Sequence, residues 1–325
     1  MLVAVGLVFA VRRQSEPEPK PQPASEVAKV IDEIILSPVP SFDNSAIWYF
    51  TAEGRLFRLT PDGSLLEASM PVLDGILKSA LWAPVGSDFV LTSVVDNSES
   101  KKYYSDQQKI YINLPVNMQS IDWLPDGKRI AYIWKSGDNA RQSLATADAD
   151  GSGFETIKEV FWADLIVKAS PDGKNVLMYR GKPEGDSNKI YLVNLETGNI
   201  STLISQGKTT SALWVNAQRF IYAQSTVTTY PRLYLYDFIT QTSVDLGLNT
   251  VLDKATIDKE GKNLYAAVPK KDNTGDVFMK VDLTNFKSEV YYEPAGSVRA
   301  KSLMLMGNTV YFVNSADGKL YTINK

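Results

Sequence analysis

The stretch ADADGSGFETIKE, residues 147–159, has the spacing of a calcium-binding EF-hand loop. Counting from Asp148, oxygen-bearing side chains fall at positions 1, 3 and 5, namely Asp148, Asp150 and Ser152. A glycine stands at position 6 and Glu159 at position 12, as such a loop requires. Whether these residues bind a metal depends on the elements that flank them, because an EF-hand loop needs a helix on each side.

The rest of the composition restricts the chemistry that is open to the chain. Its 325 residues include neither histidine nor cysteine, which excludes disulfides, imidazole and thiolate metal ligands, and catalysis by a histidine or cysteine. Carboxylates, Lys, Tyr, Ser, Thr or an oxygen-bound metal remain. The formal net charge is −3 and no long basic run occurs, so we expect no nucleic-acid partner. We also expect no cofactor.

The N-terminal segment predicts a tethered protein. Residues 1–11 are apolar or glycine and precede two arginines, but a membrane-spanning helix needs ~20 apolar residues. We interpret residues 1–13 as the remnant of a membrane anchor. The alternative is a disordered tail that results from a wrongly assigned start of the sequence. Residues 14–26, QSEPEPKPQPASE, contain four prolines and predict an extended, stiff linker. This layout predicts a body held at a membrane outside the cytoplasm, although the arginines favour the cytoplasmic side.

From about residue 27 the chain repeats one pattern: a strand, a turn and a second strand that carries an aromatic residue. The clearest copies are IDWLPDGKRIAYIW (121–134), KASPDGKNVLMYR (168–180) and ATIDKEGKNLYAAV (255–268). Pro-Asp-Gly forms turns, because proline presets φ, aspartate bonds its own backbone and glycine accepts a positive φ. A third strand and a weaker fourth follow, and the period is 41–46 residues. Four strands at this period predict an all-β, seven-bladed β-propeller of antiparallel blades.

The seventh copy ends after its third strand. We therefore predict that residues 27–32 supply its fourth strand and close the ring, which removes the open sheet edges. We expect the propeller to be monomeric. The expected blades cover about 34–70, 71–117, 118–160, 161–205, 206–248, 249–293 and 297–325 plus 27–32.

This register gives the calcium-like stretch a second interpretation. RQSLATA is the third strand of its blade and FETIKEV the fourth, so DADGSG is the hairpin turn between them. Both flanks are then strands rather than helices, and Glu159 lies too far along the fourth strand to fold back as a ligand. Asp148 and Asp150 remain candidates for a cation site that does not use Glu159.

The PDGK-type turn, the IYxxN third strand and the D-G-S turn resemble the repeats of TolB-like, WD-type β-propellers over about residues 27–325. The pattern is also similar to the N-terminal propellers of dipeptidyl-peptidase and prolyl-oligopeptidase enzymes, without their hydrolase domain or its G-x-S-x-G motif. TolB-like oligogalacturonate lyases use histidines, which this chain lacks. The resemblance implies the fold and leaves the function open.

In a propeller, the loops between second and third strands share one face with the connections between blades. Long loops on one face are the usual binding surface of a repeat ring. The candidate contacts in these loops are Tyr103, Tyr104, Arg180 and Tyr230, with solvated loops and incidental tyrosines as the alternative. Three tryptophans recur just before the first turn of their blades, which predicts packing between blades rather than a ligand cage: Trp82, Trp123 and Trp214.

Two functions remain. The favoured hypothesis is a non-catalytic, membrane-tethered scaffold that binds a protein or glycan in the cell envelope. The alternative is an extracytoplasmic hydrolase or lyase acting on saccharides through carboxylates or an oxygen-liganded metal. The alternative requires clustered Asp or Glu residues together with an Arg or Tyr.

Overall fold

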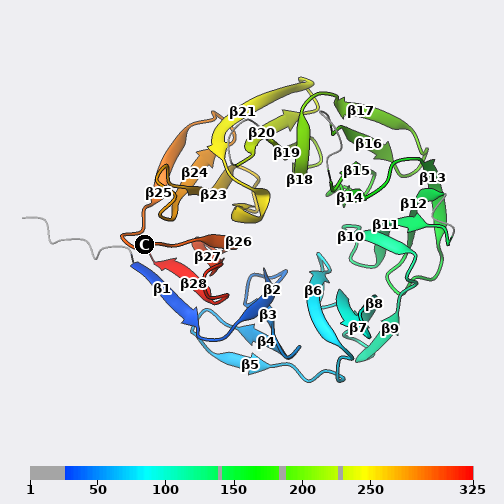
Figure 1. The fold of residues 1–325 in the computed structure, drawn as a ribbon, viewed down its shortest axis with the longest axis horizontal. Helices are drawn as coiled ribbons and strands as arrows, with labels where there is room; N and C mark the ends of the chain where they lie inside the picture. The colour runs from blue at the N-terminus through cyan, green and yellow to red at the C-terminus, as the bar shows by residue number, and fades with distance from the viewer. Residues whose placement is uncertain (1–25, 138–140, 183–187, 226–229, 325) are drawn as a thin grey trace, which may run out of the picture.

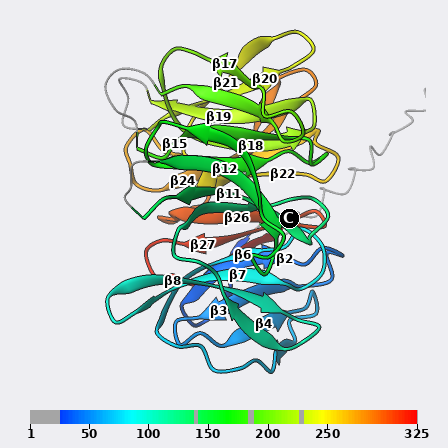
Figure 2. The same cartoon turned by 90° about the vertical axis from the view of Figure 1, so that its right-hand side faces the viewer.

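Seven four-stranded sheets form a closed ring in the computed structural model (Figure 1). The structure describes residues 26–137, 141–182, 188–225 and 230–324. Strands are antiparallel within every blade, and a single 3-10 turn, η1 (Leu252–Lys254), interrupts the all-β pattern of the described residues. Figure 2 shows that the strands run along the short axis of the ring, so the turns gather at its two faces. The predicted seven-bladed propeller is confirmed.

The strands of each blade follow in sequence order. Blades 1 and 2 contain β2 (Ile35–Pro40), β3 (Ile47–Thr51), β4 (Leu56–Leu59), β5 (Leu65–Glu67), β6 (Ile76–Trp82), β7 (Phe89–Val95), β8 (Ser98–Ser105) and β9 (Ile110–Asn113). Blades 3 and 4 contain β10 (Met118–Trp123), β11 (Arg129–Lys135), β12 (Gln142–Asp148), β13 (Glu155–Val160), β14 (Leu165–Ala169), β15 (Asn175–Arg180), β16 (Ile190–Asn194) and β17 (Ile200–Ile204). Blades 5 and 6 contain β18 (Lys208–Asn216), β19 (Arg219–Ser225), β20 (Arg232–Asp237), β21 (Thr242–Asn249), β22 (Ala255–Ile257), β23 (Asn263–Pro269), β24 (Asp276–Asp282) and β25 (Ser288–Tyr292). Blade 7 contains β26 (Ala300–Met306), β27 (Thr309–Asn314), β28 (Leu320–Asn324) and the N-terminal strand β1 (Glu26–Ile31).

The N-terminal strand closes the ring, as predicted. β1 pairs antiparallel with β28, from Glu26 opposite Asn324 to Ile31 opposite Leu320. Beyond the strand, Asp32 accepts hydrogen bonds of 2.6 Å from Lys29 and Lys319, which lowers the pKa of its carboxyl to about 2. The closure therefore joins the two ends of the described chain by a ladder of hydrogen bonds rather than by a covalent link.

The two faces of the ring carry different connections. One face, which we call the hairpin face, bears the turns from first to second and from third to fourth strands. The other, the crossover face, bears the loops from second to third strands and the connections between blades. On the hairpin face the Pro-Asp-Gly turns form as expected: Gly127 has φ +65°, and the Asp126 carboxylate accepts the backbone N–H groups of Lys128 and Arg129 at 2.8 and 3.0 Å.

The recurring tryptophans join neighbouring blades. Each indole N–H donates to a backbone carbonyl in the first strand of the preceding blade, at 2.8 to 3.0 Å: Trp82 to Ser37, Trp123 to Leu81 and Trp214 to Lys168. A buried indole N–H needs such a partner. The predicted packing role of these residues is confirmed.

Blade 2 differs from the sequence expectation. Its loop between the second and third strands was expected to contain Tyr103 and Tyr104. Instead Ser98–Ser105 is the third strand, β8, and Ile110–Asn113 is the fourth, β9. The reason is a two-residue hairpin at Asp96 and Asn97, which both adopt positive φ (49° and 63°) and so begin the third strand early.

No helix in the described part of the chain is long and apolar enough to cross a membrane. The proposed anchor at residues 1–13, and residues 14–25 of the linker, lie outside the described residues.

Candidate functional site

A cleft of about 710 Å³ opens on the hairpin face between blades 2 and 3. Four turns border it: 83–88 and 105–109 of blade 2, and 124–128 and 149–154 of blade 3. Its walls carry five carboxylates, which are those of Asp88, Asp106, Asp126, Asp148 and Asp150. Tyr103 and Lys128 also line it. The cleft thus brings together three residues that the sequence singled out, namely Tyr103, Asp148 and Asp150.

Tyr103 is held in the wall of this cleft. It lies near the end of β8, half-buried, and its ring packs edge-on against Trp123 with the centroids 6.2 Å apart. The phenol donates a 2.5 Å hydrogen bond to Asp88 Oδ2, and the backbone N–H of Asp106 donates to Asp88 Oδ1 at 2.9 Å. Burial, and then the Asp88 carboxylate, raise the pKa of Tyr103 to about 12. The phenol therefore stays protonated at neutral pH, and its oxygen can still accept a hydrogen bond from a ligand.

Asp150 has a structural role in its own turn. Its Oδ1 accepts hydrogen bonds from the Ser152 backbone N–H at 2.9 Å and from the Ser152 hydroxyl at 2.6 Å, which lower the pKa of the Asp150 carboxyl. Such bonds are turn chemistry, as the strand register predicted.

Asp148 is the more available carboxylate of the pair. Within the described residues its exposed side chain makes no hydrogen bond or ion pair, and its Oδ2 lies beside Gly153. A Cβ at Gly153 would come within 2.9 Å of that oxygen, and the φ of Gly153 is +58°. The turn therefore leaves room for a free carboxylate at the edge of the cleft.

The EF-hand arrangement does not form. Glu159 lies in β13 opposite Ser143, well along the strand and away from the turn. Among the described residues, no three His, Cys, Asp or Glu side chains are placed to hold one metal ion. Asp148 and Asp150 therefore lie together at the cleft but without a third ligand of these types.

Tyr104 does not belong to a binding surface, which corrects the sequence expectation. It is only 1% exposed and its ring stacks on Phe89 with the centroids 4.6 Å apart. Adjacent residues of a strand point to opposite sides of the sheet. Because residues 98–105 form a strand rather than a loop, Tyr104 faces the core while Tyr103 faces the cleft.

Arg180 and Tyr230 lie at the crossover face, away from Tyr103. Arg180 ends β15, where the buried Asn188 side chain bonds both its backbone N–H and its carbonyl. The ring of Tyr230 lies 6.0 Å from the ammonium of Lys254. The four residues proposed as one contact surface are therefore divided among two faces and the core.

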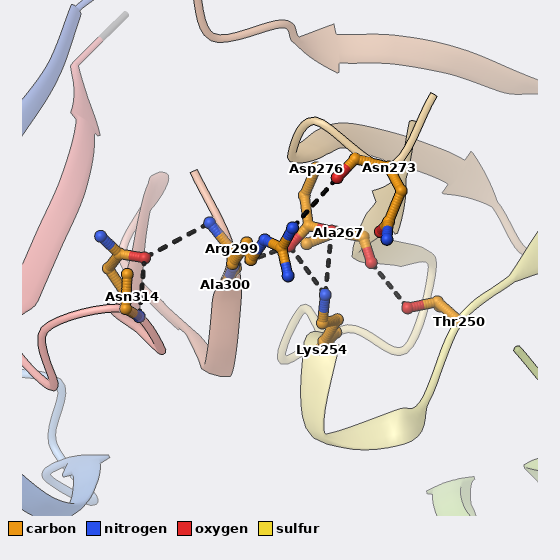
Figure 3. A network of polar contacts seen from close by, with 9 residues as sticks. Thr250, Lys254, Ala267, Asn273, Asp276, Arg299, Ala300 and Asn314 are labelled. Carbon is orange, nitrogen blue, oxygen red and sulfur yellow. Dashed lines mark hydrogen bonds and ion pairs between the residues drawn. The ribbon is translucent and has the colours of Figure 1, made fainter. Parts of the chain in front are cut away.

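The Lys254 ammonium belongs to a clamp between blades 6 and 7 (Figure 3). It contacts both oxygens of the Asp276 carboxylate, at 2.9 and 2.8 Å, and Asp276 is only 2% exposed. Asp276 also accepts the backbone N–H of Ala300 at 2.7 Å, while Arg299 donates to the carbonyl of Asn273. These bonds join blade 6 to blade 7, so we assign the group to ring assembly.

A second charged pair joins the first strands of blades 3 and 4, β10 and β14, which lie toward the centre of the ring (Figure 1). Asp122 of β10 accepts the backbone N–H of Ala169 at 2.8 Å and lies 3.7 Å from the Lys168 ammonium. Burial raises the pKa of the Asp122 carboxyl, and this outweighs the opposing effect of Lys168. Sequence reasoning named neither this pair nor Asp88, because each partnership depends on strand register.

Comparisons with known proteins match the fold. No protein-family model and no curated protein sequence matches the chain. Two oligogalacturonate lyases, one in complex with manganese and one from Vibrio parahaemolyticus, align with TM-scores of 0.68 and 0.67 at 12% and 11% identity. Each alignment covers 92% of this chain, and 92% and 93% of the lyases. TolB from Acinetobacter baumannii aligns with a TM-score of 0.53 at 15% identity, over 82% of this chain and 65% of TolB. The TolB-like propeller resemblance is confirmed as a likeness of fold.

The expectation of a non-catalytic scaffold is contradicted by the two lyases. It rested on the absence of histidine, cysteine, a G-x-S-x-G motif and a separate hydrolase domain, yet these enzymes match the propeller over nearly their whole length. These two lyases show that a propeller of this fold can carry catalysis without a separate hydrolase domain. The manganese of the one complex has no counterpart here, because the chain lacks histidine and its described carboxylates gather no metal-binding set. We derive no step through a metal.

Proposed function

We propose that the chain is a metal-independent hydrolase of saccharides that works through carboxylates in the cleft between blades 2 and 3. The end-to-end likeness to single-domain, saccharide-cleaving propellers supports the class of substrate, and the cleft supports the chemistry. The observation that carries the proposal is the Tyr103–Asp88 hydrogen bond, which holds a phenol and a carboxylate rigidly in a cleft that also contains the free Asp148.

Hydrolysis of a glycosidic bond needs two carboxyl groups, one to protonate the leaving oxygen and one to activate water or to attack the sugar carbon. Asp148 is our candidate for the first role, because no hydrogen bond or ion pair of the described residues occupies its oxygens and either can carry the proton. Asp88 is the candidate for the second role, because it is held as a carboxylate that accepts from the Tyr103 phenol and the Asp106 backbone N–H. Tyr103 orients Asp88 through its phenol, and its own oxygen is placed to accept a sugar hydroxyl.

The charge of the cleft selects the substrate. Five aspartates line it against Lys128, with Lys109 paired to Asp106 at 2.5 Å beside it. A uronate would bring further carboxylates into this field, and like charges in one site repel each other. We therefore propose a neutral or amino-sugar saccharide rather than an oligogalacturonate. Elimination from a uronate also requires its carboxylate to be neutralised, so the cleft favours hydrolysis over a lyase reaction.

We further propose that the enzyme acts outside the cytoplasm, on the grounds of the apolar start and the proline-rich linker. Fractionation of cells that express the native chain tests this proposal independently of activity. Recovery in the cytosolic fraction would contradict it.

The substrate class is tested by incubating the full chain with neutral, amino-sugar and uronate oligosaccharides and measuring newly formed reducing ends. We expect cleavage of a neutral or amino-sugar substrate, and a loss of ~10²-fold or more in Asp148→Asn, the usual effect of removing a general acid or base. Asp237→Asn is the matched control, because Asp237 holds the same register position in blade 5 and accepts hydrogen bonds in the equivalent turn, outside the cleft. Cleavage of uronates alone would contradict the proposal.

A further inference from the structure

A small aromatic pocket of about 160 Å³ opens on the hairpin face at the boundary between blades 1 and 2. Phe42, Trp48 and Trp82 line it together with Pro40 and Pro84. The two indole rings are 6.0 Å apart and inclined at 50°, and Phe42 is 62% exposed at the rim. A pocket of tilted aromatic rings and prolines is the kind of surface that binds a polyproline II helix.

The tryptophans of the pocket are held in place, and a positive charge lies beside one of them. The Trp82 indole donates to the carbonyl of Ser37 at 2.8 Å, which fixes the ring. The guanidinium of Arg58 lies 6.0 Å from the Trp48 ring and donates to the hydroxyl of Ser45 at 3.1 Å. A ligand would therefore meet preformed walls, with little loss of side-chain freedom on binding.

The N-terminal part of the chain enters the ring on this same face. Glu26 begins β1 opposite Asn324, the last residue of β28, and third strands end on the hairpin face. Around the ring, β1 belongs to blade 7 and blade 1 follows it (Figure 1). The pocket lies on the other side of blade 1, between blades 1 and 2. The prolines of the segment 17–23 precede Glu26 by three to nine residues. A proline-rich chain extends ~3.1 Å per residue, which gives a reach of roughly 10–30 Å.

We propose that the proline-rich segment 17–23 of the same chain docks in the pocket formed by Phe42, Trp48 and Trp82. Its prolines favour the extended conformation that such pockets bind, so little entropy is lost on docking. Glu18 in the segment and Glu16 just before it outnumber Lys20, so residues 16–23 carry a net negative charge that complements Arg58. The pocket shares Gly86 and Ser87 with the cleft between blades 2 and 3, so the docked segment lies at the edge of that cleft.

The absence of cysteine permits a direct test on the full chain. Gln22→Cys provides a unique site for a nitroxide label, and the six tryptophans provide indole NMR signals as reporters. We expect the label to cause loss of the Trp48 and Trp82 signals while those of Trp134 and Trp214 persist. Replacing Pro17, Pro19, Pro21 and Pro23 by serine should restore the two lost signals.

Phe42→Ser should also restore the Trp48 and Trp82 signals, whereas Phe154→Ser, at an exposed phenylalanine of blade 3, should leave them lost. Equal broadening of all six indoles, or broadening elsewhere on the ring, would overturn the proposal. Broadening that arises only between labelled and unlabelled chains in a mixture would assign the pocket to a second copy and would likewise overturn it. None of these outcomes depends on enzymatic activity.

Discussion

The phenol of Tyr103 donates a 2.5 Å hydrogen bond to the carboxylate of Asp88, which joins the third strand of blade 2 to its first turn. Tyr103→Phe should therefore lower the free energy of unfolding by ~1.5–3 kcal/mol, the range for a hydrogen bond to a charged group. Urea unfolding of both proteins measures the difference. Tyr321→Phe is the matched control, since Tyr321 donates to Asp317 at 2.7 Å in blade 7. Both variants should lose stability, and only Tyr103→Phe should lose turnover.

Asp122 should make the protein less stable as the pH rises. Its pKa is raised in the folded chain, so the folded state holds the proton more tightly than the unfolded state does. Stability then falls as the pH rises from the ordinary aspartate pKa through the raised value, and the loss persists above it. Asp122→Asn removes this dependence and keeps an oxygen for the N–H of Ala169. Urea midpoints of the two proteins, measured across acidic to neutral pH, should diverge; parallel curves would refute the assignment.

The tryptophan bonds between blades should each contribute to stability. Trp214→Phe keeps an aromatic ring but leaves the carbonyl of Lys168 without its indole donor, so we expect a loss of ~1 kcal/mol or more. Trp134→Phe is the control, because Trp134 is 36% exposed. Thermal unfolding of the two variants should separate them. Equal losses of stability in the two variants would mean that the indole hydrogen bond of Trp214 makes no measurable contribution.

Tyr104 should behave as a core residue. Tyr104→Ala removes a ring that is 1% exposed and stacked on Phe89, so a loss of ~3–5 kcal/mol is expected, as for other large aromatic residues in cores. Phe154→Ala, at a side chain that is 72% exposed, should change stability by less than ~0.5 kcal/mol. Chemical denaturation measures both variants. A small loss of stability in Tyr104→Ala would contradict the core assignment and indicate that Tyr104 lies at the surface, where it could contact a partner.

The ring could be predicted from sequence because its strongest signals are local. Pro-Asp-Gly turns need a positive φ at residues such as Gly127, and Trp82, Trp123 and Trp214 recur at the blade period. Blade 2 was assigned wrongly because Asp96 and Asn97 form a hairpin that resembles the start of a polar loop. The following strand begins SESKK, and its exposed first residues hide its strand character.

The candidate site could be predicted only in part, because it is built from partners that register brings together. Tyr103 was selected because tyrosine is enriched in binding interfaces, although it lies in a strand rather than in a loop. Asp88 lies 15 residues earlier in a turn, and nothing in its own neighbourhood distinguishes it from the turn aspartates of other blades. Asp148 was noticed because it begins a calcium-binding pattern that does not form in the structure. Its importance now rests on its carboxylate, which lies in the cleft without a hydrogen bond or ion pair to the described residues.

The central claim is that carboxylates of this cleft hydrolyse a saccharide without a metal. Its most direct test is the initial rate of reducing-end release from a neutral or amino-sugar oligosaccharide, measured for the full chain with and without a strong chelator, and for Asp148→Asn. We predict that the chelator leaves the rate unchanged and that Asp148→Asn nearly abolishes it, while its urea midpoint stays close to that of the parent. A rate that the chelator abolishes, or that Asp148→Asn leaves intact, would contradict the claim.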